Sequence, residues 1–182
     1  MSLEQIPDDL PIPEDDGACD HLTEMVIPEI TLNATNNKKV NVGALDGFTV
    51  IYIYPMTGQP NIKLPEGWDS TPGARGCTPQ SCGFRDLNDE LAQYAKVYGL
   101  SSQDTEYQQE AKSRLHLPFE LLSDTEFLFK QQLSIPTFNL DGIERYKRIT
   151  LIIKKNVIKK VFYPVFPPDR NASDVLDWFS RL

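Results

Sequence analysis

One unbroken run of β-branched and aromatic residues constrains the fold more than any other feature of the chain. It extends from Phe48 to Tyr54, and both faces of the expected strand are apolar. Such a strand needs cover on both sides, so we expect it at the centre of a sheet with helices on each face. The run is far shorter than the roughly 18 apolar residues that span a bilayer. We therefore expect no membrane partner.

The charge of the chain is divided unevenly. The first 30 residues hold nine of the 26 acidic residues and no Lys or Arg, which leaves 17 acidic and 18 basic residues in the nearly neutral remainder. Residues 1–28 also contain several prolines and show neither strand nor helix periodicity. We expect a flexible acidic N-terminal arm there, followed by one folded domain over residues 29–182. Neither part has a basic stripe, which argues against nucleic acid as a partner.

The N-terminus and the cysteines suggest a compartment. No Lys or Arg precedes an apolar segment, so we expect no cleaved signal peptide and a cytoplasmic location. The three cysteines are Cys19, Cys77 and Cys82. An odd number in a reducing compartment does not predict a structural disulfide framework. The cysteines are interpreted instead as a metal site, a reactive thiol, or buried thiols without a role.

Strands and helices alternate after the central strand. We expect strands at 97–100, 119–122, 148–154 and 157–163. We expect helices that begin near Thr78, at Asp104 with Ser102 or Asp104 as the cap, at Asp124, and at Asn171 or Ser173. Residues 135–138 are expected to be an extended, Pro-bearing segment, and short strands at 30–33 and 39–42 form a hairpin before the central strand. The order βαβαβ followed by ββα predicts a thioredoxin-like α/β fold. Its central mixed sheet is flanked by helices and carries an added N-terminal β-hairpin.

A long loop separates the central strand from the first predicted helix. It covers about twenty residues, 55–76, and loops of this length inside a compact domain are usually functional. At its end Cys77 precedes Thr78, a suitable N-cap, and Pro79, which suits the first helical position. Unpaired backbone N–H groups and the helix dipole favour the thiolate there, and the thiolate is the nucleophile. The alternative is that Cys77 is a small core residue on an amphipathic helix.

The surroundings of Cys77 leave several possibilities open. The candidates for a cation beside it are Arg75, Arg85 and Arg148. The spacing to Cys82 is Cys-x4-Cys, unlike the Cys-x-x-Cys of disulfide oxidoreductases. In an unbroken helix the two side chains lie roughly 140° apart with a rise of roughly 7.5 Å, so a disulfide requires unwinding. If Thr78 is the N-cap, the two cysteines instead flank the first turn, where side chains often touch.

The cysteine segment resembles a known family. Gly76-Cys77-Thr78, a second cysteine at Cys82 and then Phe84-Arg85-Asp86 are similar to the motif of peroxiredoxins of the peroxiredoxin Q or bacterioferritin-comigratory-protein type. The resemblance extends from about Gly47 to Leu182. It implies a thiol-dependent peroxidase for hydrogen peroxide and organic hydroperoxides, with no cofactor and no metal. The implied partners are the peroxide and thioredoxin or a similar dithiol reductant, and the implied assembly is a monomer or weak dimer.

The same resemblance implies roles for individual residues. Cys77 is the peroxidatic cysteine and Cys82 the resolving one, which together form an intrachain disulfide that the dithiol reduces. Arg148 matches the arginine that holds the thiolate and the peroxide, and Pro55 matches the proline that shields the site. The expected substrate-binding residues are Gly76, Gln80 and Arg75, with Gln80 at a position where many relatives carry Glu.

The chain departs from the family pattern at one position. The family places a Thr or Ser three residues before the peroxidatic cysteine, and here Ala74 occupies that position. The loop after Pro55 is also much longer. We expect Thr71 or Thr57 to fold back and supply the hydroxyl that orients the peroxide.

Two other functional classes are open on the sequence alone. In the first, oxidation of Cys77 changes a partner contact in a redox sensor or binding module with little turnover. In the second, Cys19 and His21 join Cys77 and Cys82 as four zinc ligands. Cys19 is otherwise a spare thiol or an alternative resolving partner.

Overall fold

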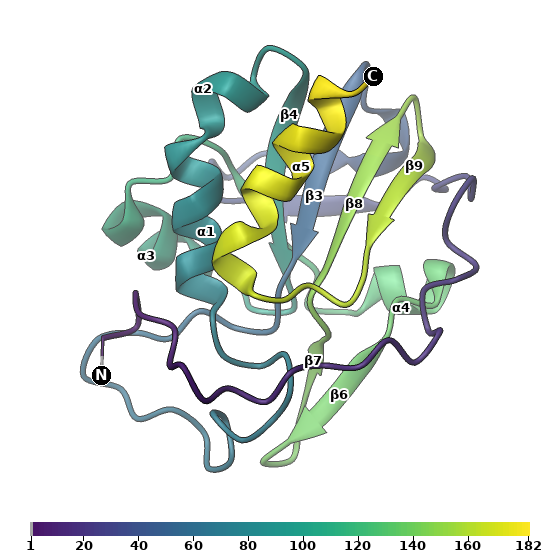
Figure 1. The fold of residues 1–182 in the computed structure, drawn as a ribbon. Helices are drawn as coiled ribbons and strands as arrows, with labels where there is room; N and C mark the ends of the chain where they lie inside the picture. Colours follow the sequence, from purple (N-terminus) through teal and green to yellow (C-terminus); the bar gives the residue numbers. More distant parts are fainter. Residues whose placement is uncertain (1) are drawn as a thin grey trace.

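The computed structural model describes residues 2–182 and has a mixed β-sheet through its centre (Figure 1). Seven strands form the sheet in the order β2-β1-β5-β4-β3-β8-β9. They are β1 (Thr31–Ala34), β2 (Lys39–Asn41), β3 (Phe48–Ile53), β4 (Ala95–Ser101), β5 (Leu121–Ser123), β8 (Ile149–Lys154) and β9 (Val157–Phe162). β3 pairs in parallel with β4 and antiparallel with β8, while β1 and β2 form the N-terminal hairpin. The predicted central mixed sheet and hairpin are therefore confirmed.

Helices follow the strands in the predicted order. They are α1 (Cys77–Asp86), α2 (Asn88–Leu91), α3 (Thr105–Leu115), α4 (Leu128–Leu133) and α5 (Asn171–Ser180), with short 3-10 turns η1 (Val42–Ala44) and η2 (Pro168–Arg170). The order β3-α1-β4-α3-β5, followed by β8-β9-α5, confirms the thioredoxin-like arrangement. Within residues 2–182, every helix falls short of the length and apolarity that crossing a membrane requires.

The side chains of β3 alternate between two hydrophobic clusters on opposite faces of the sheet. Val50 and Tyr52 belong to the cluster that contains residues of α1, α3 and α5. Ile51 and Ile53 belong to the other cluster, which contains Leu22 of the N-terminal arm and residues of α4. Both faces of β3 are therefore covered, as its apolar sequence requires. The second face differs from the prediction, because the arm and one short helix cover it instead of a full helical layer.

The acidic N-terminal arm lies against the body of the domain (dark purple in Figure 1). Leu22 and Ile27 are buried, and Val26 forms a bridge with Val157 at the start of β9. Nearer the N-terminus, Asp16 accepts hydrogen bonds from Lys147 Nζ at 2.9 Å and from Tyr163 Oη at 2.7 Å. The position of the arm is thus defined by contacts along its length. Its flexibility and the boundary at residue 28 stay predictions.

The first helix begins and ends differently from the prediction. Its N-cap is Gly76 and its first residue is Cys77, so the expectation that Thr78 caps the helix is wrong. The helix also breaks at Leu87, before the short α2. Tyr94 continues the helical spacing of Phe84, Leu87 and Leu91, which predicts it on the buried face of one long helix. Because the helix breaks, Tyr94 is instead 43% exposed and stacks on a ring of α5.

Two later elements also differ in their limits. Asp124 precedes α4, and its carboxylate accepts hydrogen bonds from the backbone N–H groups of Leu128 and Phe129. The segment expected to be merely extended begins a separate two-stranded sheet, β6 (Thr137–Leu140) and β7 (Ile143–Tyr146). The turn between these strands is Asp141-Gly142, and both residues have positive φ. Asp-Gly is a strong hairpin signal, so the sequence contained this information.

Candidate active site

Cys77 is the first residue of α1 and is buried, with 3% of its surface exposed. Gly76 before it has φ +110°, a left-handed conformation that favours glycine. A Cβ added at Gly76 would lie 2.6 Å from Cγ of Pro168. Position 76 therefore needs glycine for its φ and for its close packing against η2. This local geometry fixes the start of the helix at the sulfur-bearing residue.

Two N–H donors surround the sulfur of Cys77. Nη2 of Arg148 donates to Sγ at 3.3 Å, and the backbone N–H of Met56 donates to it at 3.4 Å. The thiol itself is directed to the carbonyl oxygen of Ala74 at 3.7 Å. A guanidinium, a peptide N–H and a helix N-terminus all stabilise a negative charge on sulfur. The site is therefore built to stabilise negative charge on this sulfur.

Arg148 is held by an extended set of hydrogen bonds. It lies just before β8, next to the end of β3, because Ile149 pairs with Ile53. Its Nη1 donates to Oε1 of Gln80 at 2.5 Å, and its Nη2 donates to the carbonyl oxygen of Ala74 at 3.0 Å. The side-chain partners of its guanidinium within residues 2–182 are the Gln80 amide and the Cys77 sulfur. Its positive charge is thus available to a thiolate.

Gln80 connects this arginine to α5. Its Nε2 donates to Oδ1 of Asn171 at 2.9 Å, and the Thr150 hydroxyl donates to the same oxygen at 2.7 Å. All of these residues are buried. Gln80 was expected at the site as a substrate-binding residue. The structure places it behind Arg148, where it orients the guanidinium.

The structure distinguishes between the two threonines that were candidates for the active-site hydroxyl. The hydroxyl of Thr71 donates to the carbonyl oxygen of Gly67 at 2.8 Å in an exposed part of the loop. Thr57 is 1% exposed, and its Oγ1 has no hydrogen-bond partner among residues 2–182. Thr57 directly follows Met56, whose N–H donates to the sulfur. Thr57 is the better candidate, because its hydroxyl is unpaired and the residue adjoins the Met56 donor to the sulfur.

The remaining predicted site residues differ in how they are placed relative to Cys77. Pro55 is buried and precedes Met56, as a shielding residue should. The guanidinium of Arg75, by contrast, donates to Asp69 at 2.9 Å and to the carbonyl oxygen of Ser2 at 3.1 Å. Arg75 therefore ties the long loop together and joins it to the arm. Arg85 pairs with its neighbour Asp86, so Arg148 is the cation that contacts the sulfur.

Cys82 lies on the same helix as Cys77. It is half-buried, and burial raises the pKa of its thiol. Because the helix includes both residues, helical geometry puts their Cα atoms roughly 8 to 9 Å apart, beyond the about 7 Å limit for a disulfide. Both are free thiols here. A bond between them requires the first turns of α1 to unwind.

The four hypothetical zinc ligands are not brought together. Cys19 is packed in the cluster beneath the arm, on the opposite face of the sheet from the cluster that contains Cys77. Nε2 of His21 is 2.8 Å from the carbonyl oxygen of Leu133. Within residues 2–182, no three His, Cys, Asp or Glu side chains are grouped as a metal site would need. The zinc hypothesis therefore has no structural basis in the described part of the chain.

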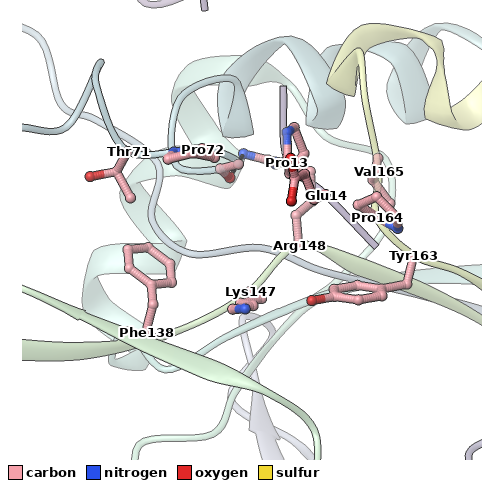
Figure 2. Close-up of a pocket in the computed structure, with 11 residues that line it drawn as sticks. Pro13, Glu14, Thr71, Pro72, Phe138, Lys147, Arg148, Tyr163, Pro164 and Val165 are labelled. Carbon is pink, nitrogen blue, oxygen red and sulfur yellow. Dashed lines mark hydrogen bonds between the residues drawn. The ribbon is translucent and has the colours of Figure 1, made fainter. Parts of the chain in front are cut away.

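A pocket of about 270 Å³ opens beside Arg148 (Figure 2). Segments distant in the sequence line it: Pro13 and Glu14 of the arm, Thr71, Pro72 and Gly73 of the long loop, Phe138 of β6, Lys147 and Arg148 before β8, and Tyr163, Pro164 and Val165 after β9. Its wall is mainly apolar apart from the two cations and Glu14. The pocket thus adjoins the arginine that contacts the sulfur.

Sequence reasoning missed two contributors to the site. The Met56 donor is a backbone group, so no residue type could reveal it. Asn171 was expected only as a possible start of the last helix, yet its side chain supports Gln80. The signal that could have identified Asn171 is its place as a polar residue in the first turn of an otherwise apolar helix.

Comparisons with known proteins show the family of this chain. The profile of the Redoxin family matches residues 23–176. The chloroplastic peroxiredoxin Q of Oryza sativa subsp. japonica is 28% identical over 157 residues, which are 85% of this chain and 65% of that protein. The chain thus spans just under two thirds of the length of that relative.

Two solved structures share the fold. Peroxidoxin BcpB from Mycobacterium tuberculosis superimposes with a TM-score of 0.71 and 22% identity, over 88% of this chain and 97% of that one. A cysteine-to-serine variant of Xanthomonas campestris peroxiredoxin Q gives a TM-score of 0.66 and 20% identity, over 95% and 97%. At sequence identities this low, the similarity to these two structures concerns the fold alone. Together with the family match, it shows that the chain belongs to the Redoxin family, with a resemblance to its peroxiredoxin Q members.

Proposed function

We propose that the protein is a thiol peroxidase in which Cys77 is oxidised by a peroxide. One observation carries the proposal: the Cys77 sulfur lies at a helix N-terminus between the Arg148 guanidinium and the Met56 N–H. Membership of the Redoxin family supports the same reading. A thiolate held among fixed donors is the arrangement that nucleophilic catalysis at sulfur requires.

In the first step, the Cys77 thiolate attacks the distal oxygen of the peroxide. An S–O bond forms while the O–O bond breaks, so the sulfur loses two electrons and the peroxide gains them. The leaving alkoxide or hydroxide takes a proton from solvent and departs as an alcohol or water. The product on the enzyme is a sulfenic acid. Arg148 and the Thr57 hydroxyl stabilise the charge that develops on the leaving oxygen.

In the second step, Cys82 resolves the sulfenic acid. Its sulfur attacks the Cys77 sulfur, the S–OH bond breaks, and water leaves as the intrachain disulfide forms. Because both cysteines lie within α1, the first turns of the helix unwind before this bond forms. Thioredoxin or a similar dithiol then reduces the disulfide by exchange and becomes oxidised itself.

The proposed substrates are hydrogen peroxide and organic hydroperoxides. Hydrogen peroxide needs only the donors around the sulfur. The mainly apolar pocket beside Arg148 offers space for the body of a larger hydroperoxide. We also propose a cytoplasmic location and a monomer or weak dimer. The name of the rice relative places that protein in the chloroplast, so expression of this chain with a fluorescent tag tests the location.

A redox sensor is the second candidate, and one observation favours it. Both cysteines lie in an intact helix, so resolution requires a structural opening that slows turnover. A slow second step leaves the oxidised protein populated, and that form could signal through a changed partner contact. The sensor and the peroxidase share the first step and differ in the rate of the second.

A coupled assay tests the peroxidase and separates it from the sensor. Peroxide is added with thioredoxin, thioredoxin reductase and NADPH, and NADPH oxidation is followed over many turnovers. We expect Cys77→Ser to abolish peroxide consumption, and Cys82→Ser to keep one stoichiometric oxidation but lose most turnover. Cys19→Ser, a matched control, should retain turnover. A wild type that consumes no more than one equivalent would favour the sensor, and unchanged consumption by Cys77→Ser would refute both.

A further inference from the structure

The peptide groups on either side of Thr57 are fixed by side chains from another element. Its backbone N–H donates to Oε1 of Gln103 at 3.1 Å. Its carbonyl oxygen accepts a hydrogen bond from the Tyr107 hydroxyl at 2.6 Å. Both backbone groups of this one residue are therefore held from the same side. The hydroxyl of Thr57 has no partner among residues 2–182 and stays available to a ligand.

Gln103 and Tyr107 are themselves firmly placed. They flank the N-cap of α3, Asp104, whose carboxylate accepts from the backbone N–H of Tyr107 at 2.8 Å. The backbone N–H of Gln103 donates to the hydroxyl of Ser101, the last residue of β4, at 3.0 Å. β4 is the parallel neighbour of β3, so the start of α3 lies at the same sheet edge as the end of β3. The hydrogen bonds from Gln103 and Tyr107 to Thr57 therefore come from residues anchored to the central sheet and not from the long loop.

The length of the loop after β3 explains why Thr57 needs hydrogen bonds from residues outside the loop. In a short loop, the chain that returns to the cysteine restrains the threonine directly. Here the chain leaves β3 and returns only at Cys77, so Thr57 stands at the beginning of a long irregular segment. Fixing one residue of a free segment costs conformational entropy, and misplaced catalytic groups lose much of their effect. Hydrogen bonds from a rigid helix start keep Thr57 fixed before the peroxide arrives.

We infer that Gln103 and Tyr107 are positioning residues that hold the Thr57 hydroxyl at the peroxide-binding side of Cys77. This inference rests on the proposed peroxidase function. Among the described residues, neither side chain hydrogen-bonds to the Cys77 sulfur, and both act through the Thr57 backbone. The inference also assigns the active-site hydroxyl of this chain to Thr57, supported by α3, although it stands far from the cysteine in sequence.

A double-mutant cycle tests the inference. Tyr107→Phe removes one oxygen and keeps the ring, and Gln103→Leu removes the acceptor for the Thr57 N–H. Each should lower kcat/KM for hydrogen peroxide about threefold to tenfold, the usual worth of one hydrogen bond. In a Thr57→Val background, where no hydroxyl remains to be placed, each should lower it less than twofold. If each variant lowered kcat/KM by the same factor in the Thr57→Val background as in wild type, the effects would be independent and the inference would be overturned.

Alkylation of Cys77 by iodoacetamide provides a second readout. This reagent needs the thiolate but not the Thr57 hydroxyl, so Tyr107→Phe and Gln103→Leu should react within about twofold of wild type. A loss of alkylation equal to the loss of peroxidase activity would show a general distortion of the site and overturn the inference. If Gln103→Leu fails to fold, Tyr107→Phe alone decides the outcome.

Matched controls remove a glutamine and a tyrosine hydroxyl elsewhere in the domain. Gln109→Leu removes a glutamine of α3 whose side chain bonds Thr35 and Asn37 in the N-terminal hairpin. Tyr94→Phe removes a partly exposed hydroxyl. Both should retain wild-type kcat/KM. A wild type without peroxidase turnover would instead refute the proposed function, so the two failures are distinguishable.

Discussion

The bond between Gln80 and Asn171 should limit how fast the disulfide forms. Gln80 lies in the first turns of α1, between the two cysteines, and its Nε2 donates to Asn171 of α5 at 2.9 Å. Unwinding of this part of α1 breaks that bond, together with the bond from Arg148 to Gln80. The intact helix is therefore held closed by contacts to two other elements. Weakening one of them selectively should make opening easier.

Asn171→Ala is the perturbation that isolates this effect. In the closed helix it leaves the buried Gln80 amide without its acceptor, at a cost of about 1–2 kcal/mol. Unwinding exposes the amide to water and removes the penalty. The opening equilibrium should therefore shift by roughly fivefold to thirtyfold toward the unwound state. If opening precedes disulfide formation, the rate of that step rises by the same factor.

Quenched mixing measures the two oxidation steps separately. Reduced protein is mixed with one equivalent of hydrogen peroxide, and samples are quenched with N-ethylmaleimide or dimedone and analysed by mass spectrometry. Asn171→Ala should form the disulfide between Cys77 and Cys82 faster than wild type. Thr150→Val is the matched control, because it removes a different bond to Asn171 and keeps the one from Gln80. Equal disulfide rates in Asn171→Ala and wild type would refute the reasoning.

Four further predictions concern single residues. Arg148→Met should slow iodoacetamide alkylation of Cys77 at pH 7 by about tenfold or more, since a charge 3.3 Å from the sulfur contributes at most about 5 kcal/mol at an effective dielectric of about 20. Burial, with acidic neighbours, raises the pKa of Cys19 to about 12, so maleimide at pH 8 should label it only after denaturation, as mass spectrometry can verify. Burial also raises the pKa of Cys82, so the thiolate fraction and the rate of disulfide formation should increase between pH 6 and pH 8 in the same quenched assay, up to about tenfold per unit. Phe138→Ala should lower kcat/KM for cumene hydroperoxide about threefold to tenfold while that for hydrogen peroxide is retained, and equal losses for both substrates would contradict a role for the pocket.

The parts of the fold that the sequence predicts are those with local signals. The apolar run of β3, the alternation of strands and helices, and the Asp104 cap each depend on neighbouring residues, and each is present in the structure. The contact between Arg148 and the Cys77 sulfur could also be predicted, from the family resemblance and from the position of Arg148 before an apolar strand. The β6–β7 hairpin was missed although Asp141-Gly142 is a local hairpin signal.

Other features depend on tertiary contacts that no local pattern contains. Thr78 has a better capping side chain than Gly76, yet the helix begins two residues earlier because Gly76 packs against Pro168 of η2. The choice between Thr57 and Thr71 depends on how a long loop folds, and that is decided by partners such as Tyr107. Loop conformations of this length are outside the range of propensity arguments.

The strand pairing that places Arg148 has a consequence for how the chain can change in length. Alternate residues of β8 point to opposite faces of the sheet, so deleting one residue between Ile149 and Ile153 would turn the guanidinium away from α1. Insertions in the segment between β3 and α1 cost little, because closure entropy grows only logarithmically with length. Single-codon insertions and deletions should therefore be tolerated in the more exposed middle of that segment, residues 59–66, and should abolish activity within β8, a contrast that deep mutational scanning would display.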